Sequence, residues 1–143
     1  MPKLVQIFTD GGSRGNPGNS AIGVWVVVDQ QPTYSHSGYI GIATNNIAEY
    51  KAFLHSLNWV EKQFVQPVEL EWSLDSLLVV NQINGLWKIK DLELKKIATL
   101  CATKLKLLKE RGFVYQIKHI PREENHAADA LVNQALDQLP HSV

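Results

Sequence analysis

The sequence predicts one α/β domain built around a five-stranded mixed sheet that is flanked by helices. Its 143 residues, 45% of them hydrophobic and 20% charged, suit a single globular domain with a substantial core. Runs of β-branched and aromatic residues follow one another near the start of the chain, separated by turn residues. Farther along, segments with a helical period alternate with strand-like runs, which is the pattern of helical crossovers between parallel strands.

The first part of the chain predicts an antiparallel meander. Strands are expected at residues 4–9, 21–29 and 34–42, where valine, isoleucine and aromatic residues gather. The glycine-rich segment 11–18 is expected to be a loop, and the Gln-Gln-Pro segment 30–32 predicts the next turn. Short connections of this kind join neighbouring antiparallel strands.

The rest of the chain predicts alternating helices and strands. In chain order the expected elements are a helix at 46–62, a strand at 68–74, helices at 76–84 and 92–108, a strand at 113–120, and a last helix from 121 to about 136. Both of these strands follow helical segments, so they are expected to run parallel to the first strand. With no repeat, low-complexity tract or linker in view, we expect residues 1–143 to form a single domain.

The charge of the chain is zero overall but unevenly distributed. Residues 87–119 contain nine Lys or Arg and three acidic residues, a net charge of +6, so the remainder carries −6. A basic binding surface beside an acidic site would give this distribution. A lysine-rich helix face in contact with solvent would also give it.

The sequence lacks the marks of a secreted or membrane protein. Cys101 is the only cysteine, which excludes a disulfide framework and a cysteine-based zinc site. The longest apolar run, residues 21–28, is too short to cross a bilayer. We therefore expect a cytoplasmic protein, monomeric, with no membrane association and no protein partner implied.

Four acidic residues, each inside its own local pattern, are the candidate functional residues: Asp10, Glu49, Asp75 and Asp129. Each also has a purely structural interpretation. Asp10 precedes a glycine, as in an Asp-Gly turn, and Glu49 is spaced three residues from Asn46, as in a capping box. Asp75 is placed to cap the helix that follows it, and Asp129 to lie on the solvated flank of the last helix.

The predicted topology brings the four acids together. Asp10 and Asp75 follow strands expected to be parallel neighbours, at the sheet edge where open α/β sheets bind ligands. Glu49 is expected on the sheet-facing side of its helix, and Asp129 on a helix that packs back on the sheet. Such a group of carboxylates repels itself unless cations are bound, and Mg²⁺ prefers carboxylate ligands. Two ions about 4 Å apart would stabilise both the attacking and the leaving oxygen of a displacement at phosphorus.

Four segments, in order and in spacing, resemble the type 1 ribonucleases H. They are Asp-Gly-Gly-Ser-Arg-Gly-Asn-Pro-Gly from Asp10, Thr-Asn-Asn-Ile-Ala-Glu up to Glu49, the segment from Asp75 through Lys88, and Ile-Pro-Arg-Glu-Glu-Asn-His-Ala-Ala-Asp-Ala-Leu, which contains Asp129. The resemblance covers residues 4–136. It implies the ribonuclease H-like fold for the whole chain.

The resemblance also implies an activity and a cofactor. The activity is hydrolysis of the RNA strand of an RNA–DNA hybrid, leaving 5′-phosphate and 3′-hydroxyl ends. By this similarity Asp10, Glu49, Asp75 and Asp129 are expected to hold two Mg²⁺ or Mn²⁺ ions, one activating water and the other stabilising the leaving 3′ oxygen.

Contacts with the hybrid are expected by the same resemblance. The expected contact residues for the hybrid, including the RNA 2′-hydroxyls, are Gly11, Ser13, Asn16, Asn45 and Asn46, while Thr44 is expected at a DNA-strand phosphate. Trp87, flanked by Lys88 and Lys90, is expected either to line the groove for the DNA strand or to be a core residue. Relatives use a mobile polar residue near the last acid for product release, and His119, Glu124 and His126 are all candidates.

The sequence departs from the pattern of many relatives in two places. Leu77 stands where they have glutamine, and Trp87 leads almost directly into the next helix without a basic protrusion. With no separate hybrid-binding domain expected either, we expect weaker affinity for the hybrid. The alternative functions are a related metal-dependent nuclease or strand transferase acting on DNA, and a non-catalytic nucleic-acid-binding module.

Overall fold

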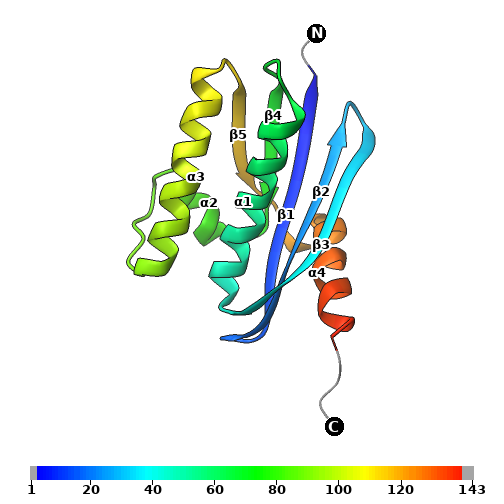
Figure 1. Ribbon diagram of the computed structural model, residues 1–143, viewed down its shortest axis with the longest axis vertical. Helices are drawn as coiled ribbons and strands as arrows, with labels where there is room; N and C mark the ends of the chain where they lie inside the picture. Colours follow the sequence, from blue (N-terminus) through cyan, green and yellow to red (C-terminus); the bar gives the residue numbers. More distant parts are fainter. Residues whose placement is uncertain (1–2, 140–143) are drawn as a thin grey trace.

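A computed structural model describes residues 3–139, so residues 1–2 and 140–143 of the expected domain lie outside the described part (Figure 1). The strands are β1 (Leu4–Gly15), β2 (Gly18–Val28), β3 (Gln31–Ala43), β4 (Glu69–Leu74) and β5 (Val114–His119). They form one five-stranded sheet in the order β3-β2-β1-β4-β5. The first three strands pair antiparallel, and β4 and β5 run parallel to β1, which confirms the predicted mixed sheet.

Helices cover both faces of this sheet. They are α1 (Asn45–Gln63), α2 (Leu77–Ile83), α3 (Leu92–Glu110) and α4 (His126–Asp137), with a 3₁₀ turn at Arg122–Glu124. Successive residues of a strand face opposite sides, and a Cβ added at Gly11 would meet α1 whereas one at Gly12 would meet α4. Helices α1 and α4 therefore lie on opposite faces. None of the helices in residues 3–139 is long and apolar enough to cross a membrane.

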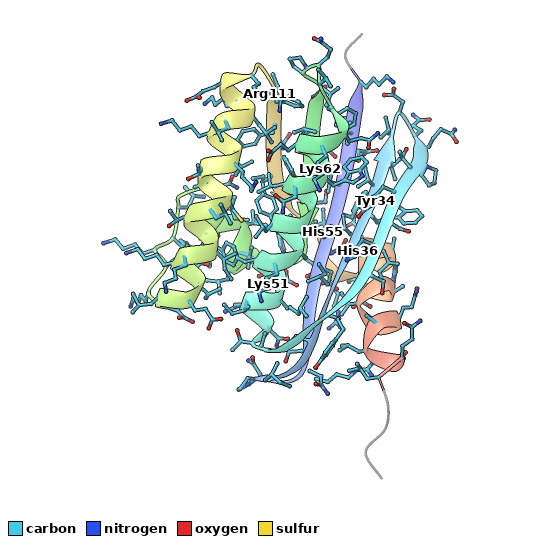
Figure 2. The ribbon with its side chains drawn as sticks, in the orientation of Figure 1. Tyr34, His36, Lys51, His55, Lys62 and Arg111 are labelled. Carbon is cyan, nitrogen blue, oxygen red and sulfur yellow. The ribbon has the colours of Figure 1, made fainter. Side chains whose placement is uncertain are left out.

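The hydrophobic core is larger on the face covered by α1 and α3. Its largest fully buried side chains include Trp72, Tyr50 and Phe53, and the one cysteine, Cys101, is buried there as well. A smaller cluster, formed by Ala21, Val132, Ala135 and Leu136, lies under α4. The edge strand β3 is joined to α1 by stacked rings, with Tyr34 on β3 and His55 on α1 also linked by a hydrogen bond of 2.8 Å (Figure 2).

The predicted glycine-rich loop at 11–18 is wrong, because most of this segment continues the two strands. Residues 11–15 of β1 pair with residues 18–22 of β2, so only Asn16 and Pro17 remain in the turn. The next turn also differs from the expected 30–32: Asp29 and Gln30 form it, with φ of +48° and +70°. This pair of left-handed residues is the geometry of a tight two-residue hairpin.

The last helix begins later than predicted. Pro121 does not open it directly, because residues 122–124 form a 3₁₀ turn and Asn125 then leaves helical geometry, with φ −113° and ψ 33°. Helix α4 starts only at His126. The interruption places the side chain of Asn125 in the interior, beside Thr9 in the middle of β1 and Asp75 just after β4.

Candidate active site

Three carboxylates meet at the carboxyl end of the parallel strands. Asp10 lies within β1, where it pairs with Gly23 of β2 instead of forming a turn. Asp75 directly follows β4, the parallel neighbour of β1, and Glu49 projects from the start of α1. Asp10, Glu49 and Asp75 each offer an oxygen within 4.8 Å of the others, and we call them the carboxylate cluster.

Glu49 is buried and is held by the backbone of β1. The backbone N–H of Gly11 donates to Glu49 Oε1 at 2.7 Å, while Oε2 is buried without a hydrogen-bond partner. Glu49 therefore does not close a capping box with Asn46. The cap is Thr44, whose Oγ1 accepts from the backbone N–H of Ile47 at 3.2 Å.

Asp75 is partly buried and does not cap the helix that follows. Ser76 does, because its Oγ accepts from the backbone N–H of Val79 at 3.3 Å. Asp75 Oδ2 instead accepts from Asn125 Nδ2 at 3.1 Å. Sequence reasoning missed Asn125, because the last helix was expected from residue 121 and this residue then falls inside it, whereas the structure interrupts the helical geometry there.

Asp129 lies in the first turn of α4, outside the carboxylate cluster but on the same cavity. Its side chain is 31% exposed, and its Oδ1 lies 3.8 Å from Nη2 of Arg122. Asn133, one turn farther along α4, donates to Asp129 Oδ2 at 3.4 Å. The structure thus groups three of the four predicted acids within 4.8 Å of one another and places the fourth on the same cavity, between Asp10 and Arg122.

Burial and the neighbouring acids disfavour the charged forms of two carboxylates of the cluster. Burial, with the charges of Asp75 and Asp129 adding to it, raises the pKa of Asp10 to about 7. Burial, and then the neighbouring Asp10, raise the pKa of Glu49 well above its usual range. A bound cation reverses this, because it favours the charged carboxylates. An all-oxygen donor set and the unpartnered Glu49 Oε2 fit a hard divalent cation.

The cavity above the cluster measures about 530 Å³ and is lined by several of the predicted substrate residues. Those that line it are Gly11, Ser13, Asn45 and Asn46. Hydrogen bonds fix this wall: Ser13 N–H donates to Asn45 Oδ1 at 2.8 Å, and Asn45 N–H donates to Asn16 Oδ1 at 3.0 Å. The tip of the β1–β2 hairpin is thereby tied to the start of α1.

The other predicted residues lie outside this cavity wall as far as residues 3–139 define it. Trp87 is 46% exposed, so it is not a core residue. It lines a separate cavity of about 520 Å³ next to α3, together with Lys88 and Lys95. His119 ends β5, Glu124 belongs to the 3₁₀ turn and His126 opens α4, and all three side chains are exposed.

Comparison with known proteins identifies the family. The model of the family described as Reverse transcriptase-like matches residues 8–135. Ribonuclease HI of Halobacterium salinarum is 39% identical over 136 residues, which are 93% of this chain and 64% of that protein. The chain belongs to the ribonuclease H family. A bifunctional protein of Mycobacterium tuberculosis is 34% identical over 140 residues, and the chain spans 37% of its length. The chain thus spans less than two thirds of these ribonuclease H relatives.

Solved structures agree with this assignment. A ribonuclease H1 isolated from compost superposes with a TM-score of 0.85 at 38% identity, covering 94% of this chain and 96% of the other. The same relative in complex with an RNA/DNA hybrid gives a TM-score of 0.81 at 39% identity, covering 94% and 97%. The predicted ribonuclease H-like fold is confirmed.

Proposed function

We propose that this protein is a metal-dependent endoribonuclease that hydrolyses the RNA strand of RNA–DNA hybrids, giving 5′-phosphate and 3′-hydroxyl ends. The observation that carries the proposal is the carboxylate cluster at the base of an open cavity in a ribonuclease H fold. A relative 39% identical to this chain has been solved with an RNA/DNA hybrid, which supports the substrate.

The four carboxylates Asp10, Glu49, Asp75 and Asp129 would hold two Mg²⁺ ions, for which Mn²⁺ would substitute. When bound, such ions supply an activated water on one side of the phosphorus and charge stabilisation of the leaving 3′ oxygen on the other. The fit rests on oxygen-only donors, the short distances within the cluster and the unpartnered buried oxygen of Glu49.

The residues of the chain position the carboxylates and the hybrid. The Gly11 N–H fixes Glu49, and the Asn125 amide fixes Asp75. On the cavity wall, Ser13, Asn45 and Asn46 offer amide and hydroxyl groups of the kind that recognise RNA 2′-hydroxyls. Asn16, which accepts from Asn45 N–H, would contact the hybrid beside them, and Thr44 would contact a phosphate of the DNA strand.

A basic surface next to α3 would hold the DNA strand. Trp87 is exposed, and so are Lys88, Lys90, Lys95 and Lys96 around it. Backbone phosphates bind to such lysines without sequence preference, and an exposed aromatic ring adds stacking.

For product release, His119, Glu124 and His126 stay the candidates. Each candidate would be replaced by alanine, and the rates of cleavage would be measured under multiple-turnover and single-turnover conditions. Replacement of the product-release residue should slow the first rate but leave the second unchanged.

We also propose that the protein is a monomer and that it works in the cytoplasm. Its only cysteine is a buried free thiol, which suits a reducing compartment. Sedimentation equilibrium with and without hybrid would test the monomer, because a mass of twice 16.1 kDa would contradict it. Cell fractionation would test the location.

The deciding experiment is cleavage of an RNA–DNA hybrid labelled on either strand, with Mg²⁺ or Mn²⁺, by the wild type and by Asp10→Asn. Cleavage of the RNA strand alone, lost in the folded variant and with duplex DNA left intact, is the expected result. Cleavage of DNA would favour the related nuclease instead. Hybrid binding without cleavage by the folded wild type under either metal would leave a non-catalytic module.

A further inference from the structure

Asn125 stands at the point where three segments of the active site meet. The residue is only 1% exposed, although it lies in the short connection between the 3₁₀ turn and α4. Nδ2 donates to the backbone oxygen of Thr9 at 3.0 Å and to Asp75 Oδ2 at 3.1 Å. Its own backbone oxygen accepts from the N–H of Asp129 at 3.1 Å. One residue therefore contacts the neighbour of Asp10, Asp75 itself and the backbone of Asp129.

The side chain of Asn125 is not used for the role that its position suggests. It is the N-cap residue of α4, and asparagine is among the preferred residues there because its side-chain oxygen accepts from the first free N–H groups of the helix. No such bond is present. The side chain turns away from its own helix and toward the sheet.

The orientation of the amide is fixed by its two partners. Both atoms at hydrogen-bond distance from Nδ2 are acceptors, a peptide oxygen and a carboxylate oxygen, so the NH₂ group must face them. The opposite atom, Oδ1, is consequently buried without a hydrogen-bond partner in the described structure. The fold thus leaves the buried oxygen of the amide unpaired, while the NH₂ group donates to both Thr9 and Asp75. Helix capping alone does not require this arrangement.

From this geometry we propose that Asn125 is a positioning residue, which holds the Asp75 carboxylate in register with Asp10 for divalent cation binding. A neutral amide suits this task, because it donates a hydrogen bond to one oxygen of Asp75 without neutralising the charge that attracts the cation. A lysine or arginine at this place would orient Asp75 as well but would compete with the cation. The inference rests on the proposed function for its effect on catalysis, but not for its effect on cation binding.

Two variants separate positioning from capping. Asn125→Ala removes the amide, whereas Asn125→Ser also removes the contact with Asp75 but keeps a residue that caps helices as well as asparagine does. Asn84→Ala is the matched control: the Asn84 amide also donates to a strand carbonyl, that of Ile117 at 3.1 Å, but contacts no carboxylate. Folding of each variant is checked by near-UV circular dichroism before any other measurement.

The measurements are Mn²⁺ binding to the free protein, followed by electron paramagnetic resonance, and steady-state cleavage of a hybrid. For both Asn125 variants we expect Mn²⁺ affinity and kcat to fall about ten-fold or more while KM for the hybrid stays within about two-fold. The Asn84→Ala control is expected to match the wild type in all three.

A folded Asn125→Ser with wild-type Mn²⁺ affinity and kcat would overturn the proposal, and so would equal losses in Asn84→Ala. If the wild type bound Mn²⁺ but cleaved no hybrid, the proposed function would fail while the binding measurements would still decide the role of Asn125.

Discussion

At the scale of single residues, Glu49 is the clearest sign that the site is built for a ligand. A buried carboxylate ordinarily needs several hydrogen bonds or an opposite charge, because desolvation disfavours its charged form. Glu49 has one hydrogen bond, from Gly11 N–H, and one buried oxygen without a partner. Its nearest charged neighbours are acidic as well. The residue therefore lowers the stability of the free protein at the pH where it ionises.

This leads to a prediction for Glu49→Gln in the absence of divalent cations. Because the pKa of Glu49 is raised in the folded state, ionisation above its ordinary pKa costs stability, and the cost grows as pH rises. Glutamine is neutral and keeps an acceptor for Gly11 N–H. We expect its free energy of unfolding to exceed that of the wild type by on the order of 2 kcal/mol at pH 8, with a much smaller difference near pH 4.

Urea unfolding in EDTA at a series of pH values measures this difference. Glu61→Gln is the control, because Glu61 is exposed and pairs with Lys104, a surface ion pair worth no more than about 1 kcal/mol. A Glu49→Gln protein that is less stable than the wild type at pH 8 would contradict the prediction.

At the scale of helices and strands, two glycines set how closely α1 and α4 approach the sheet. A Cβ at Gly11 would lie 2.2 Å from the backbone of Ala48, next to Glu49, and a Cβ at Gly23 would lie 2.2 Å from the backbone oxygen of Ala128, next to Asp129. Gly23 pairs with Asp10 across the β1–β2 ladder. Both close approaches thus lie beside a carboxylate, so the helices that carry Glu49 and Asp129 contact the sheet where Asp10 is.

Gly11→Ala tests this close approach. The obstructing atoms are helix backbone and cannot turn aside, so α1 must shift, and we expect a loss of unfolding free energy of about 3 kcal/mol or more. The adjacent Gly12→Ala is the control, because its Cβ would meet only the side chain of Val132 at 3.1 Å. Chemical denaturation of both variants gives the comparison. Equal losses for the two would show that the backbone contact does not set the position of α1.

The sequence predicted the regular elements well and the connections poorly, for a physical reason. Asp75 directly follows a strand and Glu49 lies near the start of a helix, and burial sets the faces of both elements, so the positions of the two acids could be inferred from the pattern alone. The glycines of segment 11–18 predict a loop when they are interpreted locally, whereas ladder pairing and helix packing keep all of it except the turn at residues 16–17 extended. The direction of the Asn125 side chain depends on Thr9 and Asp75, which are distant in sequence, so no local sequence pattern could predict it.

The contact between β3 and α1 gives a second prediction at this scale. The rings of His36 and His55 stack with centroids 3.9 Å apart, and the hydroxyl of Tyr34 lies 2.8 Å from His55 Nε2 (Figure 2). Burial, with His36 adding to it, lowers the pKa of His55 to about 4. The unfolded chain therefore binds a proton that the folded chain rejects between about pH 6.5 and 4, so this contact loses stability as pH falls through that window.

His55→Phe keeps an aromatic ring in this position and removes the protonation of His55. We expect the difference in unfolding free energy between the wild type and His55→Phe to shift in favour of the variant as pH falls from 7 to 4.5, measured by urea unfolding. A difference that is independent of pH would contradict this account.

At the scale of the whole molecule, a net charge of zero hides two separate charged regions. The acidic one is the carboxylate cluster, at the carboxyl end of the parallel strands. The basic one includes the four exposed lysines that flank Trp87 and the start of α3, whereas Lys104 and Lys118 are paired with Glu61 and Glu71. The two arginines that line the cavity of the cluster, Arg14 and Arg122, are paired with Asp137 and Asp129, so a divalent cation is the charge that would complete the cluster.

This separation predicts that divalent cations stabilise the folded protein, and more strongly as pH rises. Cations that bind only the folded chain add about 2.7 kcal/mol at a concentration 100 times their Kd. Protons compete for the same oxygens, because burial raises the pKa of Asp10 to about 7 and that of Glu49 as well. The gain in stability should therefore be small at pH 5 and large at pH 8.

Thermal unfolding with Mn²⁺, compared with unfolding in EDTA at both pH values, measures this gain. Asp10→Asn should lose most of the gain at pH 8. A gain that is as large in this variant, or larger at pH 5 than at pH 8, would mean that the cation binds elsewhere.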